Sequence, residues 1–224
     1  MYKRQGIEST TTVLPSDTTQ KDAISVINQL NNDPNVNAIL IQLPLPNHMD
    51  TDALINAIDP QKDVDGLTDI NVGRLSRGKP LFTPCTPKGI VTLLNHYQIP
   101  ISGQNIAIIG RSRIVGKPLS YCLTNLHATV TLCHQKTVGL SDIIGNSNMV
   151  ISATGNRQTI QPNWLQENTV VVDVGIHRTS KGICGDLDLE SVKERLRAYT
   201  PVPRGVGPMT VCSLLENTAQ AAQI

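Results

Sequence analysis

The chain has 224 residues, 39% of them hydrophobic and 17% charged, with a formal net charge of +1. It can bury one large core or two small ones, but it has no positive excess for binding nucleic acid or an anionic membrane. Five scattered cysteines without metal-ligand spacing, no membrane-length apolar run and no signal-like start predict a cytoplasmic protein with no metal site.

The first predicted elements are helical. Residues 1–5 look like the last turn of a helix that Gly6 ends, and residues 7–14 look extended. The next helix should run from residue 19 to about residue 31. Its Thr-x-x-Asp start forms a capping box, and apolar residues then recur at helical spacing.

Residues 38–43, AILIQL, predict a buried strand that Pro44 stops. Gln42 is the polar residue in this strand, and a buried amide there would need hydrogen-bond partners. The amide is either a structural hydrogen-bonding group or a site residue at the carboxyl end of the strand. The pattern favours the structural role.

A short helix over residues 51–58 leads to two carboxylates, Asp63 and Asp65, next to Gly66. Carboxylates at this spacing could bind a cation, cap a helix, or accept hydrogen bonds from a polar heterocycle. Calcium is disfavoured because the loop lacks the further acidic ligands of an EF-hand.

Residues 71–85 contain two glycines and two prolines, and they predict a loop. A helix should then open with Thr86 at its N-cap and Pro87 at its first position. It should end close to Gln98, where we place the boundary between two lobes. Its buried face should consist of Ile90, Leu93, Leu94 and Tyr97.

Four apolar segments begin near residues 106, 129, 149 and 169. Their spacing of about 20 residues is typical of parallel strands joined by helices, and therefore predicts a doubly wound α/β lobe. The carboxyl ends of such strands share one edge of the sheet, where a ligand would bind.

The first of these strands leads into a turn, GRSRIVGKP at 110–118, whose glycine spacing is not G-x-G-x-x-G. A glycine-bearing turn without a ligand is therefore an alternative at this point. Arg111 and Ser112 could donate to a 2′-phosphate, and residues 134–136 bring no carboxylate for the ribose hydroxyl of NAD. The sequence favours NADP, although His134 and Lys136 are interpreted first as a solvated strand end.

Near its end the chain carries a rigid loop, PVPRGVGP at 201–208, and a helix that should begin at Pro208. The loop is either a connector or the lining of a cleft between the lobes. The helix could pack back on the first lobe with an apolar face made of Val211, Leu214, Leu215, Ala219 and Ala222.

Six motifs in order closely resemble the family of bifunctional NADP-dependent methylenetetrahydrofolate dehydrogenase/methenyltetrahydrofolate cyclohydrolase. They are QLPLP at 42–46, KDVDG at 62–66, TPCTPKG at 83–89, GRSRIVGKP at 110–118, DVGI at 173–176 and PVPRGVGPMT at 201–210. The resemblance implies oxidation of 5,10-methylenetetrahydrofolate with NADP and hydrolysis of the methenyl product to 10-formyltetrahydrofolate. Both steps would share one cleft, in a cytoplasmic homodimer.

For the fold, the resemblance implies two α/β lobes. Residues 1–97 would form a folate-binding catalytic lobe whose N-terminal part is missing, and residues 98–200 a Rossmann-like NADP lobe with a parallel sheet. Residues 201–224 would supply a site loop and a helix that returns to the first lobe.

The resemblance also assigns roles to residues. Asp65 would bind the pterin and Gln42 would contact the catalytic lysine, so these two are the expected catalytic residues. The expected folate-binding residues are Ile41, Gln42, Leu43, Asp65, Pro203, Arg204, Gly205, Val206 and Gly207. The expected NADP-binding residues are Gly110, Arg111, Ser112, Gln135, Ile176 and Thr210.

One departure from the family concerns its Tyr-x-x-x-Lys motif on an N-terminal helix. Aligning Gly6 with the glycine that ends this helix puts the lysine before Met1, and Tyr2 and Lys3 are in the wrong register to replace it. The family's first helix, first strand and most of its second helix would then be absent. We expect the core of the first lobe to be exposed as a result.

Two single-residue departures affect the expected sites. Arg204 stands where the family has glycine, which disturbs the loop if that position needs a positive φ. Gln135 replaces a serine that commonly helps to hold the 2′-phosphate.

Two alternative functions remain. One alternative is a catalytically inactive NADP-binding protein that lacks the catalytic lysine. Another is a shikimate-dehydrogenase-like enzyme, whose expected Lys and Asp pair has no convincing counterpart here.

Overall fold

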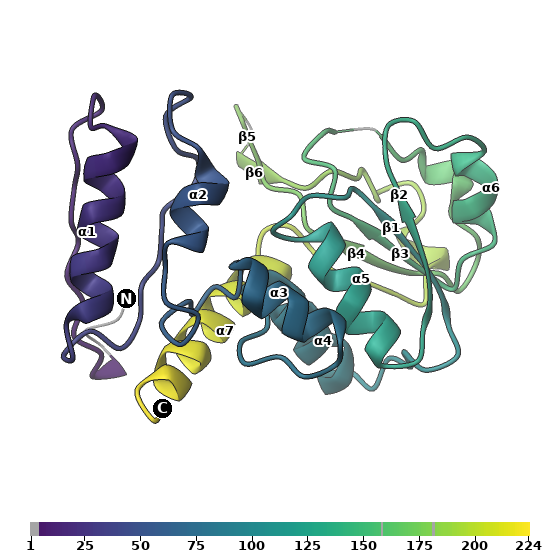
Figure 1. The fold of residues 1–224 in the computed structure, drawn as a ribbon. Helices are drawn as coiled ribbons and strands as arrows, with labels where there is room; N and C mark the ends of the chain where they lie inside the picture. Colours follow the sequence, from purple (N-terminus) through teal and green to yellow (C-terminus); the bar gives the residue numbers. More distant parts are fainter. Residues whose placement is uncertain (1–4, 158, 181) are drawn as a thin grey trace.

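The computed structural model describes residues 5–157, 159–180 and 182–224. Two parts flank a group of central helices (Figure 1). Helices α1 (Gln20–Asn32) and α2 (Thr51–Asn56) belong to the first part, and a twisted sheet forms the second. The central helices are α3 (Asp69–Ser76), α4 (Cys85–His96) and α7 (Val206–Ala221). The helix end expected at residues 1–5, including Tyr2 and Lys3, falls outside the described residues except for Gln5.

The second part is built on a five-stranded parallel sheet with the order β2-β1-β3-β4-β7. Four strands confirm the prediction, and β7 was not predicted because two residues are too few to form a pattern. The strands are β1 (Asn105–Ile109), β2 (Thr129–Cys133), β3 (Met149–Ser152), β4 (Val170–Asp173) and β7 (Ala198–Tyr199). β2, the next strand along the chain, lies on one side of β1, and β3 lies on the other side of β1. The carboxyl edge at β1 and β3 is therefore the topological switch point of the sheet.

The central strands are buried on both faces of the sheet, and their alternate residues point into two separate cores. Ile106 and Ile108 of β1 pack with α4 and with α5 (Gly116–Asn125) on one face. Ala107 and Ile109 pack on the other face with side chains from and around α6 (Leu140–Gly145) and two short helices. These short helices are η2 (Pro162–Trp164) and η3 (Lys193–Arg195). An antiparallel hairpin, β5 (His177–Thr179) and β6 (Gly182–Cys184), follows β4.

The predicted buried strand at residues 38–43 is wrong. A single parallel bridge joins Ile39 to Asp63, and Ile39 is buried whereas Leu40 is 43% exposed. The side chains alternate between a packed side and an open side, so the continuous apolar run does not correspond to burial on both faces. Leu40 and the more distant Val13, which is 84% exposed, are apolar side chains at the surface of the first lobe, but core residues such as Ile27 and Leu54 are buried. The expectation that the core of this lobe is exposed is therefore wrong for the described residues.

The predicted loop at residues 71–85 is partly wrong, because α3 occupies Asp69–Ser76. Thr68 caps the helix by accepting a hydrogen bond from the Asn71 amide, and Leu75 is buried on its inner face. The cap and the buried leucine together outweigh the conformational cost of about 1 kcal/mol that a helical glycine such as Gly73 brings.

The predicted start of α4 is wrong by more than one position. The helix begins at Cys85 with Pro84 at its N-cap, and the Thr86 hydroxyl forms a hydrogen bond with Thr210 of α7. The predicted apolar face is also too long, because Tyr97 is 67% exposed. The helix has already ended there, so the helical spacing no longer applies.

Helix α7 packs on the first lobe, as predicted, but through a different face. Its buried residues are Val206, Ser213, Asn217 and Ala221. The Asn217 amide donates to the carbonyl oxygens of Val64 at 2.8 Å and Thr83 at 3.0 Å. Asn217 is buried here because its amide binds backbone and side-chain groups of the first lobe. An apolar pattern cannot show that.

Candidate active site

The two carboxylates of the KDVDG segment have different environments. Asp63 is buried and accepts hydrogen bonds from the amides of Leu67 and Thr68, at 3.1 and 2.8 Å, and from the Asn71 side chain at 2.8 Å. These bonds hold the start of α3. Of the three roles considered for the two carboxylates, which were cation binding, helix capping and binding of a heterocycle, Asp63 therefore has the helix-capping role.

Asp65 is left as the carboxylate that can bind a ligand. It lines a cavity of about 10 Å³, which has room for about one water molecule, together with Asp63, Ile41 and Leu43. Burial raises its pKa above the ordinary value, although hydrogen bonds from Cys85 oppose the rise. Burial also raises the pKa of the Cys85 thiol, so this thiol stays protonated at neutral pH and can donate.

Gln42 is exposed, so the expectation of a buried amide is wrong. Its side chain points to the side of the segment opposite Ile41 and Leu43, and its amide donates to the carbonyl oxygen of Leu43 at 3.1 Å. The structure thus groups Ile41, Leu43 and Asp65 around one cavity and leaves Gln42 beside it.

The predicted helix start at Pro208 is wrong by two residues, because α7 begins at Val206 with Gly205 as its N-cap. The expected folate-binding residues 203–207 therefore span the end of the loop and the first residues of α7. Pro203 and Arg204 are exposed, whereas Gly205 and Val206 are buried. Arg204 has a φ of +81°, so this position does adopt the conformation that favours glycine. A Cβ added to Gly207 would lie 3.9 Å from Cδ1 of Ile176, which brings this loop and the end of β4 together.

Sequence reasoning missed the contacts that join α4 to α7. The Thr86 and Thr210 hydroxyls are 3.0 Å apart, and Lys88 Nζ donates to Asn217 Oδ1 at 2.9 Å. Lys88 also forms an ion pair with Glu216 at 3.0 Å. These partners lie more than 120 residues apart in the chain. Local spacing could not reveal them, although Thr86, Lys88 and Thr210 belong to the quoted motifs.

The glycine turn after β1 is closely packed. Gly110 has a φ of +117°, and a Cβ there would lie 2.1 Å from the carbonyl oxygen of Ala153, at the end of β3. A Cβ at Gly116 would lie 1.9 Å from the carbonyl oxygen of Gly110. The Ser112 hydroxyl accepts from the amides of Val115 at 3.2 Å and Gly116 at 3.4 Å, and its own proton can still be donated.

The turn has the chemistry that an anionic nucleotide requires. The exposed Arg111 guanidinium and the Ser112 hydroxyl lie just before α5, at the switch point of the sheet. Beyond β2, His134 accepts from the Lys136 amide at 3.1 Å, and Gln135 is exposed. Ile176, which follows β4, is 63% exposed despite its apolar side chain. These residues all lie near the carboxyl edge of the sheet.

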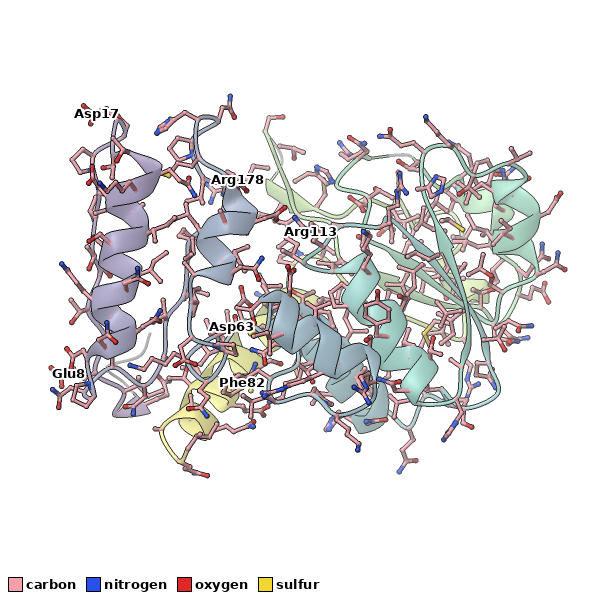
Figure 2. The ribbon with its side chains drawn as sticks, viewed as in Figure 1. Glu8, Asp17, Asp63, Phe82, Arg113 and Arg178 are labelled. Atoms are coloured by element: carbon pink, nitrogen blue, oxygen red, sulfur yellow. The ribbon has the colours of Figure 1, made fainter. Side chains whose placement is uncertain are left out.

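A second cavity of about 270 Å³ lies between α2, α3 and α5. Arg113 of the glycine turn reaches into the space between α2 and α5, where it forms an ion pair with Asp52 (Figure 2). This pair connects the first lobe directly to the turn.

Within the described part of the chain, no group of three or more His, Cys, Asp or Glu residues could hold a metal ion. No helix among these residues is long and apolar enough to cross a membrane.

Comparison with known proteins shows two matching family domains. Residues 1–65 match the tetrahydrofolate dehydrogenase/cyclohydrolase catalytic domain, and residues 84–224 match the NAD(P)-binding domain of the same family. Proteins named bifunctional protein FolD from Methanoculleus marisnigri and Geotalea uraniireducens are each 46% identical to the chain. In both comparisons the match covers 99% of this chain and 79% of the relative.

The chain belongs to the tetrahydrofolate dehydrogenase/cyclohydrolase family. The fold agrees, since the bifunctional enzyme FolD from Campylobacter jejuni superimposes with a TM-score of 0.96 at 43% identity. A FolD enzyme from Trypanosoma brucei, solved with NADP and an inhibitor, gives a TM-score of 0.92 at 33% identity. The matches cover 99% of this chain and 79% and 78% of the two enzymes. They confirm the predicted family, the α/β class and the nicotinamide-nucleotide lobe.

Proposed function

We propose that the chain oxidises 5,10-methylenetetrahydrofolate to 5,10-methenyltetrahydrofolate with NADP and hydrolyses the product to 10-formyltetrahydrofolate. Membership of the family over 99% of the chain supports this function. The single structural observation that carries it is Asp65. This carboxylate is not used by the helix start that engages Asp63, and it lies beside Ile41 and Leu43, where burial raises its pKa.

Asp65 binds the pterin in this proposal. A carboxylate can accept two N–H bonds from an aminopyrimidine edge, and its burial strengthens each of them. Ile41, Leu43 and the 203–207 loop contact the rest of the folate. Gln42, whose side chain is exposed, takes the role that the family resemblance implies, which is contact with the catalytic lysine.

The residues of the nucleotide edge fit NADP. The glycines of the turn leave room for the pyrophosphate beside the end of β1, and Arg111 and Ser112 donate to the 2′-phosphate. Ile176 and Thr210 contact the cofactor near the folate, and Gln135 lies near its 2′-phosphate end. When bound, NADP accepts a hydride from the one-carbon unit of the folate. The task of the chain is to hold the two reactants in line for that transfer.

Assembly and location complete the proposal. The enzyme acts as a homodimer in the cytoplasm, as the family resemblance implies, with no nucleic acid or membrane as a partner. Sedimentation at several protein concentrations tests the dimer.

The activity test follows NADPH absorbance after the purified chain is mixed with 5,10-methylenetetrahydrofolate and NADP. Hydrolysis of the methenyl compound is followed separately through the loss of its own absorbance. We expect both activities, and we expect Asp65→Asn to reduce each by at least about tenfold through the lost acceptor. Asp142→Asn, an exposed change on α6, is the matched control.

The outcomes separate the candidate functions. NADP binding without NADPH formation would overturn the proposed activity and favour the catalytically inactive NADP-binding protein. Loss of activity in the Asp142→Asn control would show that the assay reports general damage.

A further inference from the structure

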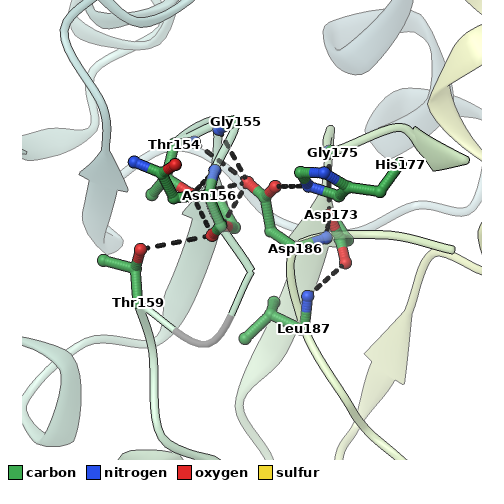
Figure 3. A network of polar contacts seen from close by, with 10 residues as sticks. Thr154, Gly155, Asn156, Thr159, Asp173, Gly175, His177, Asp186 and Leu187 are labelled. Atoms are coloured by element: carbon green, nitrogen blue, oxygen red, sulfur yellow. Dashed lines mark hydrogen bonds and ion pairs between the residues drawn. The ribbon is translucent and has the colours of Figure 1, made fainter. Parts of the chain in front are cut away.

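A buried network of polar groups joins three segments at the carboxyl edge of the sheet (Figure 3). The segments are the turn after β3, the end of β4 with its following residues, and the bend at Asp186 that follows β6. Two carboxylates, Asp173 and Asp186, lie at its centre, and both are at most 3% exposed. Buried carboxylates are stable only when donors surround them.

Asp173 holds the segment that carries Asp186. Its Oδ1 accepts from the amides of Gly175 at 2.9 Å and Asp186 at 3.0 Å, and its Oδ2 accepts from the Leu187 amide at 2.9 Å. A Cβ added to Gly185 would lie 2.0 Å from Asp173 Oδ2, so the backbone approaches the carboxylate as closely as glycine permits. The position of Asp186 is thus fixed from β4.

Asp186 in turn joins the two turns at the edge of the sheet. Its Oδ2 accepts from the Ser152 hydroxyl at 3.0 Å and from the Thr154 amide and hydroxyl, both at 2.9 Å. Its Oδ1 lies 2.7 Å from Nε2 of His177. Although burial opposes it, the hydrogen bonds from His177, Thr154 and Ser152 lower the pKa of Asp186, so it is ionised at neutral pH.

His177 directly follows Ile176, which the proposed function places against the cofactor. The His177 side chain is 20% exposed and that of Asp186 is 1% exposed, so their bond is shielded from water. A Cβ added to Gly175 would lie 2.2 Å from Asp186 Oδ1, so the backbone before Ile176 also packs against this carboxylate. Ile176 is therefore held on both sides by contacts with Asp186.

We propose that His177 is a positioning residue for the cofactor. Through its bond to Asp186 it fixes Ile176 relative to the Thr154 turn, and so sets the affinity for NADP without affecting the affinity for folate. This inference rests on the proposed function only for the identity of the ligand at the edge. A charge-assisted hydrogen bond shielded from water is strong enough to determine the position of a short turn.

The test measures NADP binding by isothermal titration calorimetry, which requires no turnover. For His177→Ala we expect the dissociation constant of NADP to rise about tenfold, as the loss of a hydrogen bond to a charged group predicts. The dissociation constant of tetrahydrofolate should stay within about twofold. His177→Gln restores a donor at similar reach and should bring NADP binding back to within about threefold of the wild type.

Two further variants keep the inference testable. His96→Ala makes the same change at an exposed histidine at the end of α4 and should leave both affinities unchanged. Thr154→Val removes one donor to Asp186 with little change in volume, and it should weaken NADP binding in the same direction. It replaces His177→Ala if circular dichroism shows that the alanine variant is unfolded.

Three outcomes would overturn the inference. The first is an unchanged NADP affinity in His177→Ala, the second is an equal loss of NADP and folate affinity, and the third is no recovery in His177→Gln. A wild-type chain that binds NADP but forms no NADPH would overturn only the proposed function. A wild-type chain that does not bind NADP would overturn both.

Discussion

At the scale of single residues, Arg111 is the side chain that should distinguish NADP from NAD. Arg111→Ala should weaken NADP binding by about tenfold or more, because a guanidinium bonded to a phosphate contributes about 1.5–3 kcal/mol. NAD binding should change by less than about twofold, since NAD has no 2′-phosphate. Calorimetric titration with each cofactor measures both effects.

Arg113→Ala is the control for that comparison, because Arg113 lies in the same turn but pairs with Asp52. It should affect the two cofactors equally. Equal losses for NADP and NAD in Arg111→Ala would contradict the assignment of Arg111.

The pKa of Asp65 gives a second prediction at this scale. Burial raises this pKa, so acid protonates Asp65 sooner than an exposed aspartate. A protonated carboxyl loses an acceptor, so folate binding should weaken as the pH falls through the raised pKa. The dissociation constant of the folate, measured at several pH values between about 4 and 7, tests the direction of this change.

Asp65→Asn has no titrating group at this position, and its folate affinity should lack that component of the pH dependence. Asp142→Asn should keep the wild-type profile. A wild-type profile that matches Asp65→Asn would show that Asp65 does not face the folate.

At the scale of elements, Asn217 is a buried residue that helps to dock α7 on the first lobe. It donates to the carbonyl oxygens of Val64 and Thr83 and accepts from Lys88. Asn217→Ala leaves these groups unpaired in a buried site and should lower the free energy of unfolding by about 2–4 kcal/mol. Urea denaturation measures this difference.

Thr218→Ala changes the next residue of α7, whose hydroxyl bonds only within the helix, to Leu214. It should alter the free energy of unfolding by less than about 0.5 kcal/mol. If Asn217→Ala costs no more than this control, the buried hydrogen bonds do not hold the helix.

The sequence predicted elements well where apolar pattern and spacing agreed. The four main strands are short apolar runs at a regular interval, and β1 and its turn were located within a residue or two. Helix α3 was missed because Gly73 and its polar residues give no apolar pattern at helical spacing. The Thr68 cap and the buried Leu75 stabilise this helix instead. The buried face of α7 was predicted wrongly because Ser213 and Asn217 are polar and buried.

The candidate site was predicted to the extent that it lies in short motifs. Asp65 and the glycine turn stand out locally, because carboxylates, glycines and cations recur there within a few residues. Spacing could not show that Asp63 would be used by α3, or that Gln42 would be exposed. The bonds between Thr86 and Thr210, and between His177 and Asp186, depend on how the chain folds back on itself.

At the scale of the whole molecule, the ion pair of Asp52 with Arg113 connects the two parts across the cavity. Both side chains are about half exposed or more, at 49% and 60%, so water screens their attraction. Asp52→Asn should therefore lower the free energy of unfolding by less than about 1 kcal/mol. The difference from the wild type should disappear in about 1 M salt, where charges are screened within about 3 Å.

Chemical denaturation at low and high salt measures this effect, with the exposed Asp17→Asn as control. If Asp52→Asn lowers the free energy of unfolding by more than about 2 kcal/mol, the prediction is contradicted. The ion pair, rather than the packing of the central helices α4 and α7, would then be the main contact between the two parts. A small change in the free energy of unfolding would mean that the buried central helices, rather than the ion pair, mainly join the two parts.

The packing of the glycine turn affects the thermodynamics of ligand capture. Backbone atoms of Ala153 and Gly110 fill the space where side chains of Gly110 and Gly116 would stand, so both ends of the turn are closely packed in the folded chain. The entropy lost in ordering this turn therefore belongs to folding rather than to binding. A nucleotide meets a preorganised surface, and its association should be governed by diffusion and charge rather than by a slow rearrangement of the turn.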